Sequence, residues 1–376
     1  MAKTTIEWCD FTFNPWRGCT KVAAGCLNCY AETLSKRNPG TLGEWGPNGT
    51  RVVASEAMWR EPAKWDEDVE TTAETWPDDR PRVFCASLAD VFEDWVGQLN
   101  NSAGELLYAD RRGGWSPNYC DMDGHRLTLN LDDVRGRVFR VIDATPNLDW
   151  LILTKRPQNI RRMLPIAHNG RDPSDPCMRR DNLWLGCSIS TQADADRDIP
   201  ELLKCRDLAA KLFVSVEPLI EPVDLSRWIA PKCSMCGHPY ASPRTPDGLC
   251  SAVDGSSPHG TLCHQDGLDW VIVGGESGSQ ARRVHLDWVR AIMGQCRGAG
   301  VACFVKQLGY RPVHQSAGGD RSIQDYHSMG WSRETPGGRV SYHAGHLHLI
   351  DRKGGDPAEW PEDLRVREMP VAKDEQ

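Results

Sequence analysis

Short apolar runs alternate along this chain with stretches of helical periodicity, and this alternation limits the possible folds more than any other feature. The runs predict strands at Val83–Ser87, Trp150–Thr154, Leu183–Ser188, Leu212–Val216, Trp270–Gly274 and Cys303–Lys306, after a first strand near Phe11–Asn14. Helices are predicted at Pro157–Leu164, Ala193–Ala210 and Leu286–Ala299. Near-continuous apolar strands between helices indicate a parallel sheet covered on both faces.

About seven β/α units follow from this pattern, which predicts an α/β fold with a complete or partial (β/α) TIM-like barrel. A doubly wound open sheet is the alternative, ranked lower because no glycine-rich dinucleotide fingerprint follows the first strand. We expect the barrel over residues 1–350, an inserted lobe or lid at 98–132, a second insertion at 231–267 and a C-terminal tail at 351–376.

Composition narrows the class of protein. The 376 residues include 15 cysteines, and the first residues lack the apolar core of a secretory signal. This favours reduced thiols and metal ligands in the cytoplasm over a disulfide framework. No apolar run approaches the roughly 20 residues that cross a membrane. The formal charge of −8 argues against a protein that coats nucleic acid, although a local basic groove remains open.

Three cysteines, Cys19, Cys26 and Cys29, stand close together with the spacing C-x6-C-x2-C. A structural zinc ion takes four ligands, so three thiolates alone leave it incomplete. An iron–sulfur cluster held by three cysteines keeps one iron open for a cofactor or substrate. We therefore predict a [4Fe-4S] cluster, with three unrelated thiols or a zinc site completed from elsewhere as alternatives.

The 231–267 insertion carries a second group of potential metal ligands. A Cys-x2-Cys pair followed by more cysteine and histidine in a loop-rich segment is typical of a zinc ribbon. The second half of the pattern is irregular, so the ligands can be combined in more than one way, and a flexible reduced loop is the alternative. We predict structural Zn²⁺ on Cys233, Cys236, Cys250 and Cys263.

Polar residues follow several predicted strands. In a β/α barrel the carboxyl ends of the strands form the mouth at which chemistry occurs. We predict a cofactor-binding group of Gly274, Gly275, Glu276, Ser277, Ser188 and Tyr30, a catalytic group of Lys155, Glu217, Glu276 and Lys306, and a substrate-binding group of Asp90, Lys155 and Arg156. For each residue, a capping role or an ion pair that closes the barrel is the alternative.

The sequence also resembles a known family. The blocks that carry the resemblance are Asn14-Pro-Trp-Arg-Gly-Cys-Thr-Lys-Val22, Leu153-Thr-Lys-Arg-Pro157, Leu212-Phe-Val-Ser-Val-Glu-Pro218, Trp270-Val-Ile-Val-Gly-Gly-Glu-Ser-Gly278 and Phe304-Val-Lys-Gln307. They look like a phage-associated family of unknown function with an N-terminal three-cysteine motif. That family is similar to radical S-adenosylmethionine barrels, and its outline is similar to the spore photoproduct lyase group.

The resemblance implies a cluster that cleaves S-adenosylmethionine reductively to a 5′-deoxyadenosyl radical, with an electron donor as a partner. The chain departs from the usual radical pattern C-x3-C-x2-C in its longer first gap and in Tyr30, which follows the last cysteine instead of preceding it. We expect action on a nucleotide, nucleic acid or modified base. The alternative is a metal-stabilised nucleic-acid-binding or structural phage protein without catalysis. The sequence indicates neither the substrate nor the oligomeric state.

Overall fold

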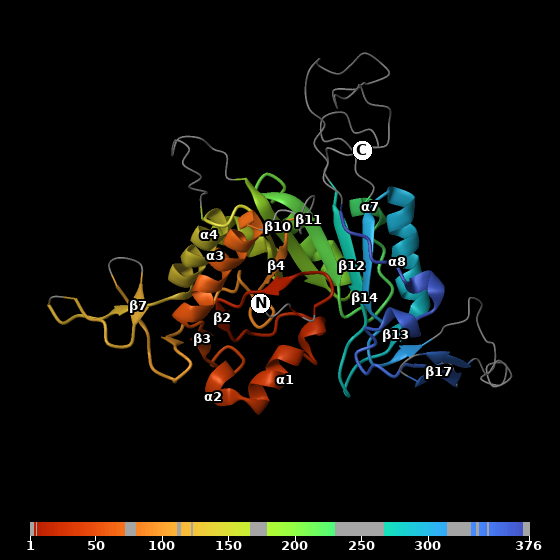
Figure 1. Ribbon diagram of the computed structural model, residues 1–376, viewed down its shortest axis with the longest axis horizontal. Coiled ribbons are helices and arrows are strands. Elements are labelled where there is room, and N and C mark those ends of the chain that lie inside the picture. Colours follow the sequence, from red (N-terminus) through yellow and green to blue (C-terminus); the bar gives the residue numbers. More distant parts are fainter. Residues whose placement is uncertain are drawn as a thin grey trace, which may run out of the picture. The chain divides into compact units, whose positions relative to one another are not determined.

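The protein is described by a computed structural model that covers residues 4, 6–71, 80–110, 114–121, 123–165, 179–229, 267–313, 332–335, 338–343 and 346–370. The helices and strands are drawn in Figure 1, coloured along the chain. The chain divides into two compact units. Unit 1 comprises Met1–Ser188 with Asp207–Ala210, and unit 2 comprises Ile189–Arg206 with Lys211–Gln376. No helix in the described ranges is long and apolar enough to cross a membrane.

The protein is mixed α/β, and its main sheet has seven parallel strands in the order β1-β4-β9-β10-β11-β12-β14. Their bounds are β1 Phe11–Thr12, β4 Arg82–Cys85, β9 Asp149–Thr154, β10 Arg180–Ile189, β11 Ala209–Val216, β12 Trp270–Gly274 and β14 Ala302–Gln307. This curled sheet fits a partial TIM-like barrel, which is the smaller of the two predicted forms. Every predicted strand of the sheet is present.

Burial explains why these runs form parallel strands. All five residues of β12 are buried, and Trp150, Leu151 and Ile152 of β9 have no exposed surface. Within unit 1, Leu151 is the register partner of both Phe84 and Trp184. A strand buried on both faces gains little from alternation, so its sequence is a continuous apolar run.

The helices of unit 1 are α1 Tyr30–Arg37, α2 Pro39–Leu42, α3 Glu56–Thr71, α4 Leu131–Asp143 and α5 Ile160–Met163, with 3₁₀ turns at Ala24–Cys26 and Pro157–Asn159. Unit 2 has α6 Gln192–Leu203, α7 Ser226–Ile229 and α8 Leu286–Ala299, with 3₁₀ turns at Pro357–Glu359 and Glu362–Leu364. The helix predicted at Leu286–Ala299 is confirmed as α8.

The helix predicted at Ala193–Ala210 is too long. Helix α6 ends at Leu203, and Ala209 already belongs to β11. Leu202, Cys205 and Leu208 are all buried, so the apolar spacing continues through the turn that follows the helix. Periodicity alone therefore does not mark this boundary.

Three smaller sheets complete the fold. Unit 1 has β2 Trp16–Arg17, β3 Arg51–Val53 and β5 Leu99–Asn100, and also an antiparallel sheet of β6 Tyr108–Ala109, β7 Trp115–Ser116 and β8 Leu127–Thr128. The second of these lies within residues 98–132, the predicted lobe. Unit 2 has β13 Val284–His285, β15 Pro312–Val313, β16 Ser332–Thr335, β17 Gly338–His343 and β18 His346–His348. The zinc-ribbon prediction for 231–267 falls almost entirely outside the described residues.

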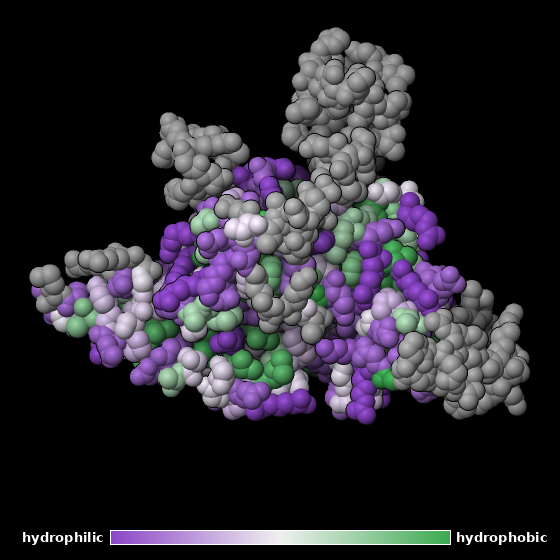
Figure 2. All heavy atoms as spheres, viewed as in Figure 1, coloured by the Kyte–Doolittle hydropathy of each residue, from purple (hydrophilic) through white to green (hydrophobic). Residues whose placement is uncertain are grey.

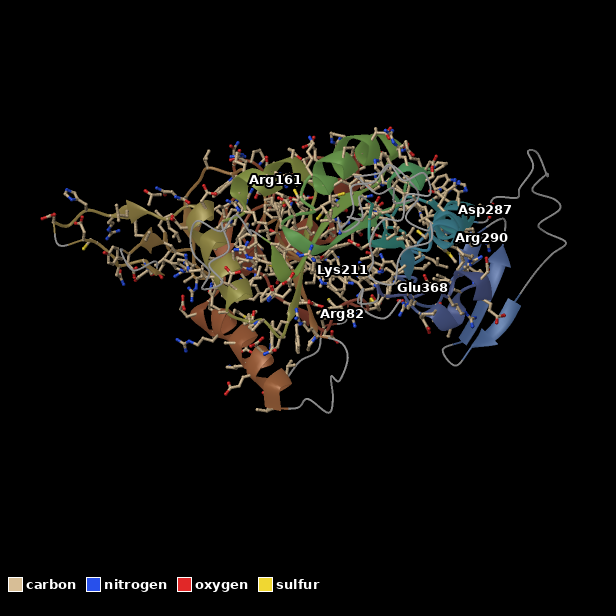
Figure 3. The ribbon with its side chains drawn as sticks, turned by 90° about the horizontal axis from the view of Figure 1, so that it is seen from above. Arg82, Arg161, Lys211, Asp287, Arg290 and Glu368 are labelled. Atoms are coloured by element: carbon tan, nitrogen blue, oxygen red, sulfur yellow. The ribbon has the colours of Figure 1, made fainter. Side chains whose placement is uncertain are left out.

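The C-terminal segment packs along β14 within unit 2. The amide of Val305 donates to the carbonyl of Val366 over 2.8 Å, and the Glu368 amide donates to the Cys303 carbonyl over 2.9 Å. Figure 3 shows Glu368 and, on α8, the neighbouring pair Asp287 and Arg290. Pairing with this segment satisfies backbone groups that the last strand of a sheet otherwise exposes.

Candidate functional site

The cysteine loop of unit 1 joins β2 to α1. Gly18, immediately before Cys19, has a φ of +111°, and a Cβ at this position would collide with the carbonyl oxygen of Thr50. Only glycine fits here without strain and a collision. Cys26 ends the 3₁₀ turn and Cys29 is the N-cap of α1, so regular backbone positions the last two thiols.

The three thiols are unpaired with other cysteines, and Cys26 is buried while the other two are half-buried. Burial raises the pKa of the Cys19 thiol, and the nearby carboxylates of Glu93 and Asp90 add to this shift. Burial also raises the pKa of Cys29, against which backbone hydrogen bonds from Glu32 and Ala31 act. These two thiols are therefore protonated at neutral pH until a metal replaces the proton.

A guanidinium group contacts the first thiol. Arg156 follows β9, and its Nη1 lies 3.7 Å from Cys19 Sγ. The same Nη1 donates to Asp90 Oδ2 over 2.7 Å, and Nη2 donates to the carbonyl of Thr20 over 2.7 Å. Burial lowers the pKa of Arg156, but Asp90, Cys19 and Glu93 together outweigh it and the pKa is raised. Arg156 is thus a permanent cation beside Cys19.

A second buried ion pair supports the first. Arg51 Nε lies 2.8 Å from Glu93 Oε2, and the two side chains are 0% and 1% exposed. Glu93 Oε1 accepts the amide of Thr20 over 2.7 Å and also faces Arg156 Nη2 at 3.4 Å. We call Arg51, Asp90, Glu93 and Arg156 the buried quartet. Glu93 accepts the Thr20 amide and Arg156 donates to the Thr20 carbonyl, so the quartet holds the backbone next to Cys19.

The predicted substrate-binding residues of unit 1 have local partners. Asp90 accepts the Thr154 hydroxyl over 2.6 Å and the Lys155 amide over 3.1 Å. Asp90 and Arg156 are 5% and 7% exposed, so a substrate would have to displace their mutual contact. The Lys155 ammonium donates to the hydroxyl of Ser188 and acts electrostatically on Cys29.

Tyr30, predicted to bind the cofactor, donates its hydroxyl to the Ser87 carbonyl over 2.6 Å. Its side chain is nevertheless 49% exposed, as are Val22 at 49% and Leu27 at 62%. Figure 2 shows apolar side chains gathered near α1 among polar ones. The outer side of the cysteine loop is therefore partly apolar.

Three thiols are the donor set of a four-iron cluster with one open iron, whereas a structural zinc site takes four ligands. Among the described residues, Asp121, Asp123 and His125 are a second group, with three potential ligand atoms within 4.8 Å of one another.

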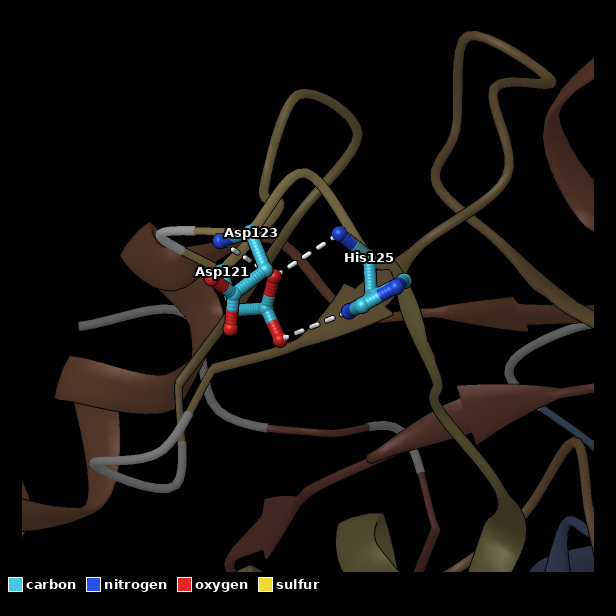
Figure 4. Close-up of side chains that lie close together, drawn as sticks. All are labelled: Asp121, Asp123 and His125. Carbon is cyan, nitrogen blue, oxygen red and sulfur yellow. Dashed lines mark hydrogen bonds and ion pairs between the residues drawn. The ribbon is translucent and has the colours of Figure 1, made fainter.

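The Asp121 group itself forms a turn (Figure 4). Asp121 Oδ1 accepts the amides of Asp123 and His125 over 3.0 and 2.7 Å. His125 Nδ1 lies 3.6 Å from Asp121 Oδ2, and both Asp123 and His125 are exposed. These contacts explain the group as a structured surface turn.

In unit 2, the predicted catalytic residues Glu217 and Lys306 pair directly. Lys306 Nζ lies 2.8 Å from Glu217 Oε1 and 2.9 Å from Oε2. The side-chain Nε2 of Gln307 donates to Glu217 Oε1 over 3.1 Å and to the Gly275 carbonyl over 2.8 Å. The carboxyl ends of β12 and β14 and the segment after β11 thus share one polar cluster.

The predicted cofactor-binding turn after β12 has a different arrangement. Glu276 is 7% exposed and accepts the amide of Arg282 over 2.8 Å and its guanidinium over 2.7 Å. A Cβ on Gly275 would collide with the carbonyl of Leu308. Close packing therefore already requires Gly275, while Gly274 lies beside Gln307 and Ser277 is half-buried.

Sequence comparison places the chain in a family. Residues 3–102 and 127–336 match the model of the family described as Protein of unknown function (DUF5131). The chain belongs to the DUF5131 family. The match skips 103–126, which lie within the predicted lobe. It includes the cysteine loop, the buried quartet and the cluster around Glu217 and Lys306.

The other comparisons do not indicate what this DUF5131 protein does. No curated protein matches it. Two solved structures of mutant spore photoproduct lyase are similar, at 16% and 12% identity and TM-scores of 0.32 and 0.29. They cover 58% and 57% of the chain, which spans about half of their length, 48% and 49%. Scores this low do not define a function.

Sequence reasoning missed half of the buried quartet, Arg51 and Glu93. One signal was available: Arg51 opens the run Arg51-Val-Val-Ala54, in which every residue is buried. A charged residue within a buried run needs a partner of opposite charge. The sequence did not indicate which acidic residue this is, because Glu93 is 42 positions away.

Proposed function

We propose that this DUF5131 protein is an iron–sulfur enzyme of the radical S-adenosylmethionine type. One observation carries the proposal: the cysteine loop presents three thiols within eleven residues, with the Arg156 guanidinium 3.7 Å from the first. When bound, a [4Fe-4S] cluster would supply one electron to S-adenosylmethionine, whose C–S bond would break to give methionine and a 5′-deoxyadenosyl radical. Cys19, Cys26 and Cys29 would hold three of its irons.

The loop's surroundings suit an anionic cluster. The buried quartet contains two guanidinium groups and two carboxylates, so its formal charges cancel. Lys155 adds a positive charge that acts on Cys29. At Cys19 the carboxylates of Glu93 and Asp90 oppose a thiolate, and the Arg156 guanidinium favours one. At Cys29 the Lys155 ammonium favours a thiolate, and such cations lower the cost of burying its charge.

We assign the cofactor to Gly274, Gly275, Glu276, Ser277, Ser188 and Tyr30, and catalytic roles to Lys155, Glu217, Glu276 and Lys306. The Glu217–Lys306 pair can exchange one partner for a ligand, since both side chains are partly exposed, at 19% and 20%. Glu217 would then accept an ammonium and Lys306 would meet a carboxylate. Glu276 is more deeply buried and pairs with Arg282, so Glu276 would have to exchange this partner before it could meet a ligand.

For the substrate we propose a nucleotide, nucleic acid or modified base. Lys155 is the best placed of the three predicted substrate-binding residues to meet a phosphate, because Asp90 and Arg156 are buried in mutual contact. An external electron donor is also implied. A cytoplasmic location and a phage association remain predictions from the sequence.

The test is anaerobic purification and reconstitution, followed by iron and sulfide analysis. We expect close to four irons per chain, and 5′-deoxyadenosine after addition of dithionite and S-adenosylmethionine. Cys26→Ala should lose the iron, whereas Cys120→Ala, which removes an exposed thiol, should keep it. Iron without cleavage of S-adenosylmethionine would support the metal-stabilised binding protein instead. Stoichiometric zinc at the loop, with no iron, would refute the cluster.

A further inference from the structure

We propose that Arg156 is a positioning residue that holds Cys19 and raises the reduction potential of the cluster, acting through the buried quartet. This inference rests on the proposed function and concerns how the protein adjusts the electronic state of the cluster. It also gives Arg156 a role other than the substrate binding predicted from the sequence.

The contacts of Arg156 support the first part. Its two terminal nitrogens reach the Cys19 sulfur at 3.7 Å, the Thr20 carbonyl at 2.7 Å and Asp90 Oδ2 at 2.7 Å. The guanidinium thus bonds both the side chain of one ligand and the backbone next to it. A planar fork with several donors can make these contacts together, and a lysine ammonium cannot reproduce them.

The supports of Arg156 fix its orientation. Asp90 receives the Thr154 hydroxyl over 2.6 Å, so the carboxylate is held at the end of β9. Glu93 is held by Arg51 and in turn accepts the Thr20 amide. Each member of the quartet therefore restrains the next, and the guanidinium cannot leave Cys19 without weakening its ion pair with the buried Asp90 carboxylate.

The charge of Arg156 supports the second part. A cluster becomes more negative when it is reduced, so a nearby cation and an N–H donor to a ligating sulfur stabilise the reduced form. Arg156 supplies both, in a site where it is 7% exposed and water screens it little. The guanidinium contact is made to Cys19. Cys26 ends the 3₁₀ turn and Cys29 is the N-cap of α1.

A phosphate-binding role for Arg156 is less compatible with these contacts. Both terminal nitrogens are already engaged by protein groups, and the side chain is buried. Lys155, half-buried and bonded to a serine hydroxyl, has fewer contacts to give up.

The experiment measures iron content, unfolding midpoint and cluster midpoint potential in reconstituted full-length protein. The variants are Arg156→Lys, Arg156→Gln and Asp90→Asn. The control is Arg135→Gln, which removes another buried arginine that donates to the Val91 and Glu93 carbonyls. We expect Arg156→Gln to lower the potential and Arg156→Lys to lower it less. Asp90→Asn should raise it, because one negative charge is removed. Arg135→Gln should lower stability and leave the potential nearly unchanged.

The outcomes separate the two proposals. If wild-type protein holds no iron, the proposed function fails. If wild type holds the cluster but the Arg156 and Asp90 variants leave the potential unchanged, the inference is overturned. Equal shifts from Arg135→Gln would also overturn it, since they would reflect general loosening. If Arg156→Gln loses iron, Arg156→Lys and the opposite shift of Asp90→Asn still decide the matter.

Discussion

Lys306 forms an ion pair with both carboxylate oxygens of Glu217, at distances of 2.8 and 2.9 Å from its ammonium nitrogen. The residues are 89 positions apart, and each follows or ends an apolar run of the parallel sheet. Because both are partly exposed, the pair contributes only about 0–1 kcal/mol to stability. Its position at the strand ends suggests binding instead.

We therefore expect Glu217→Gln to leave the unfolding midpoint nearly unchanged and to weaken binding of S-adenosylmethionine by the reconstituted protein. Loss of a charge-assisted hydrogen bond costs roughly 1.5–3 kcal/mol, or about 10- to 100-fold in Kd. Calorimetry measures this change. Glu201→Gln is the matched control, since Glu201 pairs with Lys204 at 2.6 Å on the exposed side of α6. Equal weakening in both variants would contradict a binding role for Glu217.

Arg51→Met should destabilise unit 1 strongly. It leaves Glu93, whose side chain is 1% exposed, without the guanidinium that lies 2.8 Å away. Breaking a buried ion pair costs about 3–5 kcal/mol. Urea unfolding measures the loss of stability. The double variant Arg51→Met/Glu93→Gln should recover part of it, because the carboxylate that lost Arg51 is then replaced by a neutral amide. A double variant less stable than the sum of the single changes would argue against this account.

Gly18→Ala should disturb the cysteine loop. The position combines a φ of +111° with a collision between any Cβ and the Thr50 carbonyl. Gly46 has nearly the same φ, +112°, and open space around its Cβ position. Gly46→Ala should therefore cost about 1–3 kcal/mol through backbone strain alone. Gly18→Ala should cost more and also lower the iron content, which colorimetric analysis measures. Equal losses of stability in the two variants would contradict this prediction, because they would show that the chain relieves the collision at Gly18.

The ion pair between Glu56 and Arg137 should make stability depend on pH. Hydrogen bonding to Arg137, at 2.6 and 2.7 Å, lowers the pKa of Glu56, against the opposing effect of burial. A carboxylate with a lowered folded-state pKa stabilises the protein above its unfolded pKa of about 4.3. This contribution is lost as the pH falls through the folded pKa. Glu56→Gln should thus lower the thermal midpoint slightly at pH 7, and by progressively less as the pH falls below the unfolded pKa of about 4.3. A difference that persists at low pH would exclude this cause.

Zinc is predicted in the 231–267 insertion from its sequence. Cys233→Ala and Cys236→Ala should each release about one zinc per chain, measured by metal analysis, and keep the iron of the cysteine loop. Structural zinc provides folding free energy that a loop-rich segment lacks. Full-length protein that contains no zinc would contradict this prediction.

Much of the fold could be predicted from local sequence. Six of the seven strands of the main sheet contain a continuous apolar run, and the run Trp270-Val-Ile-Val-Gly274 is buried at every residue. Burial on both faces requires apolar side chains at consecutive positions, so the sequence itself records the environment. The end of α6 could not be predicted in this way, because buried residues continue at the same spacing beyond it.

The sequence by itself determined that the three cysteines of the candidate site lie near one another, since three cysteines within eleven residues remain close in any fold. It did not determine their surroundings. Arg156 is 137 positions from Cys19 and 66 from Asp90, and Arg51 is 42 from Glu93. Local patterns reflect periodicity and turns, whereas the pairing of distant charges depends on how the strands align. Only the tertiary structure could therefore show that Arg156 is bonded to a cysteine sulfur and buried in a neutral quartet.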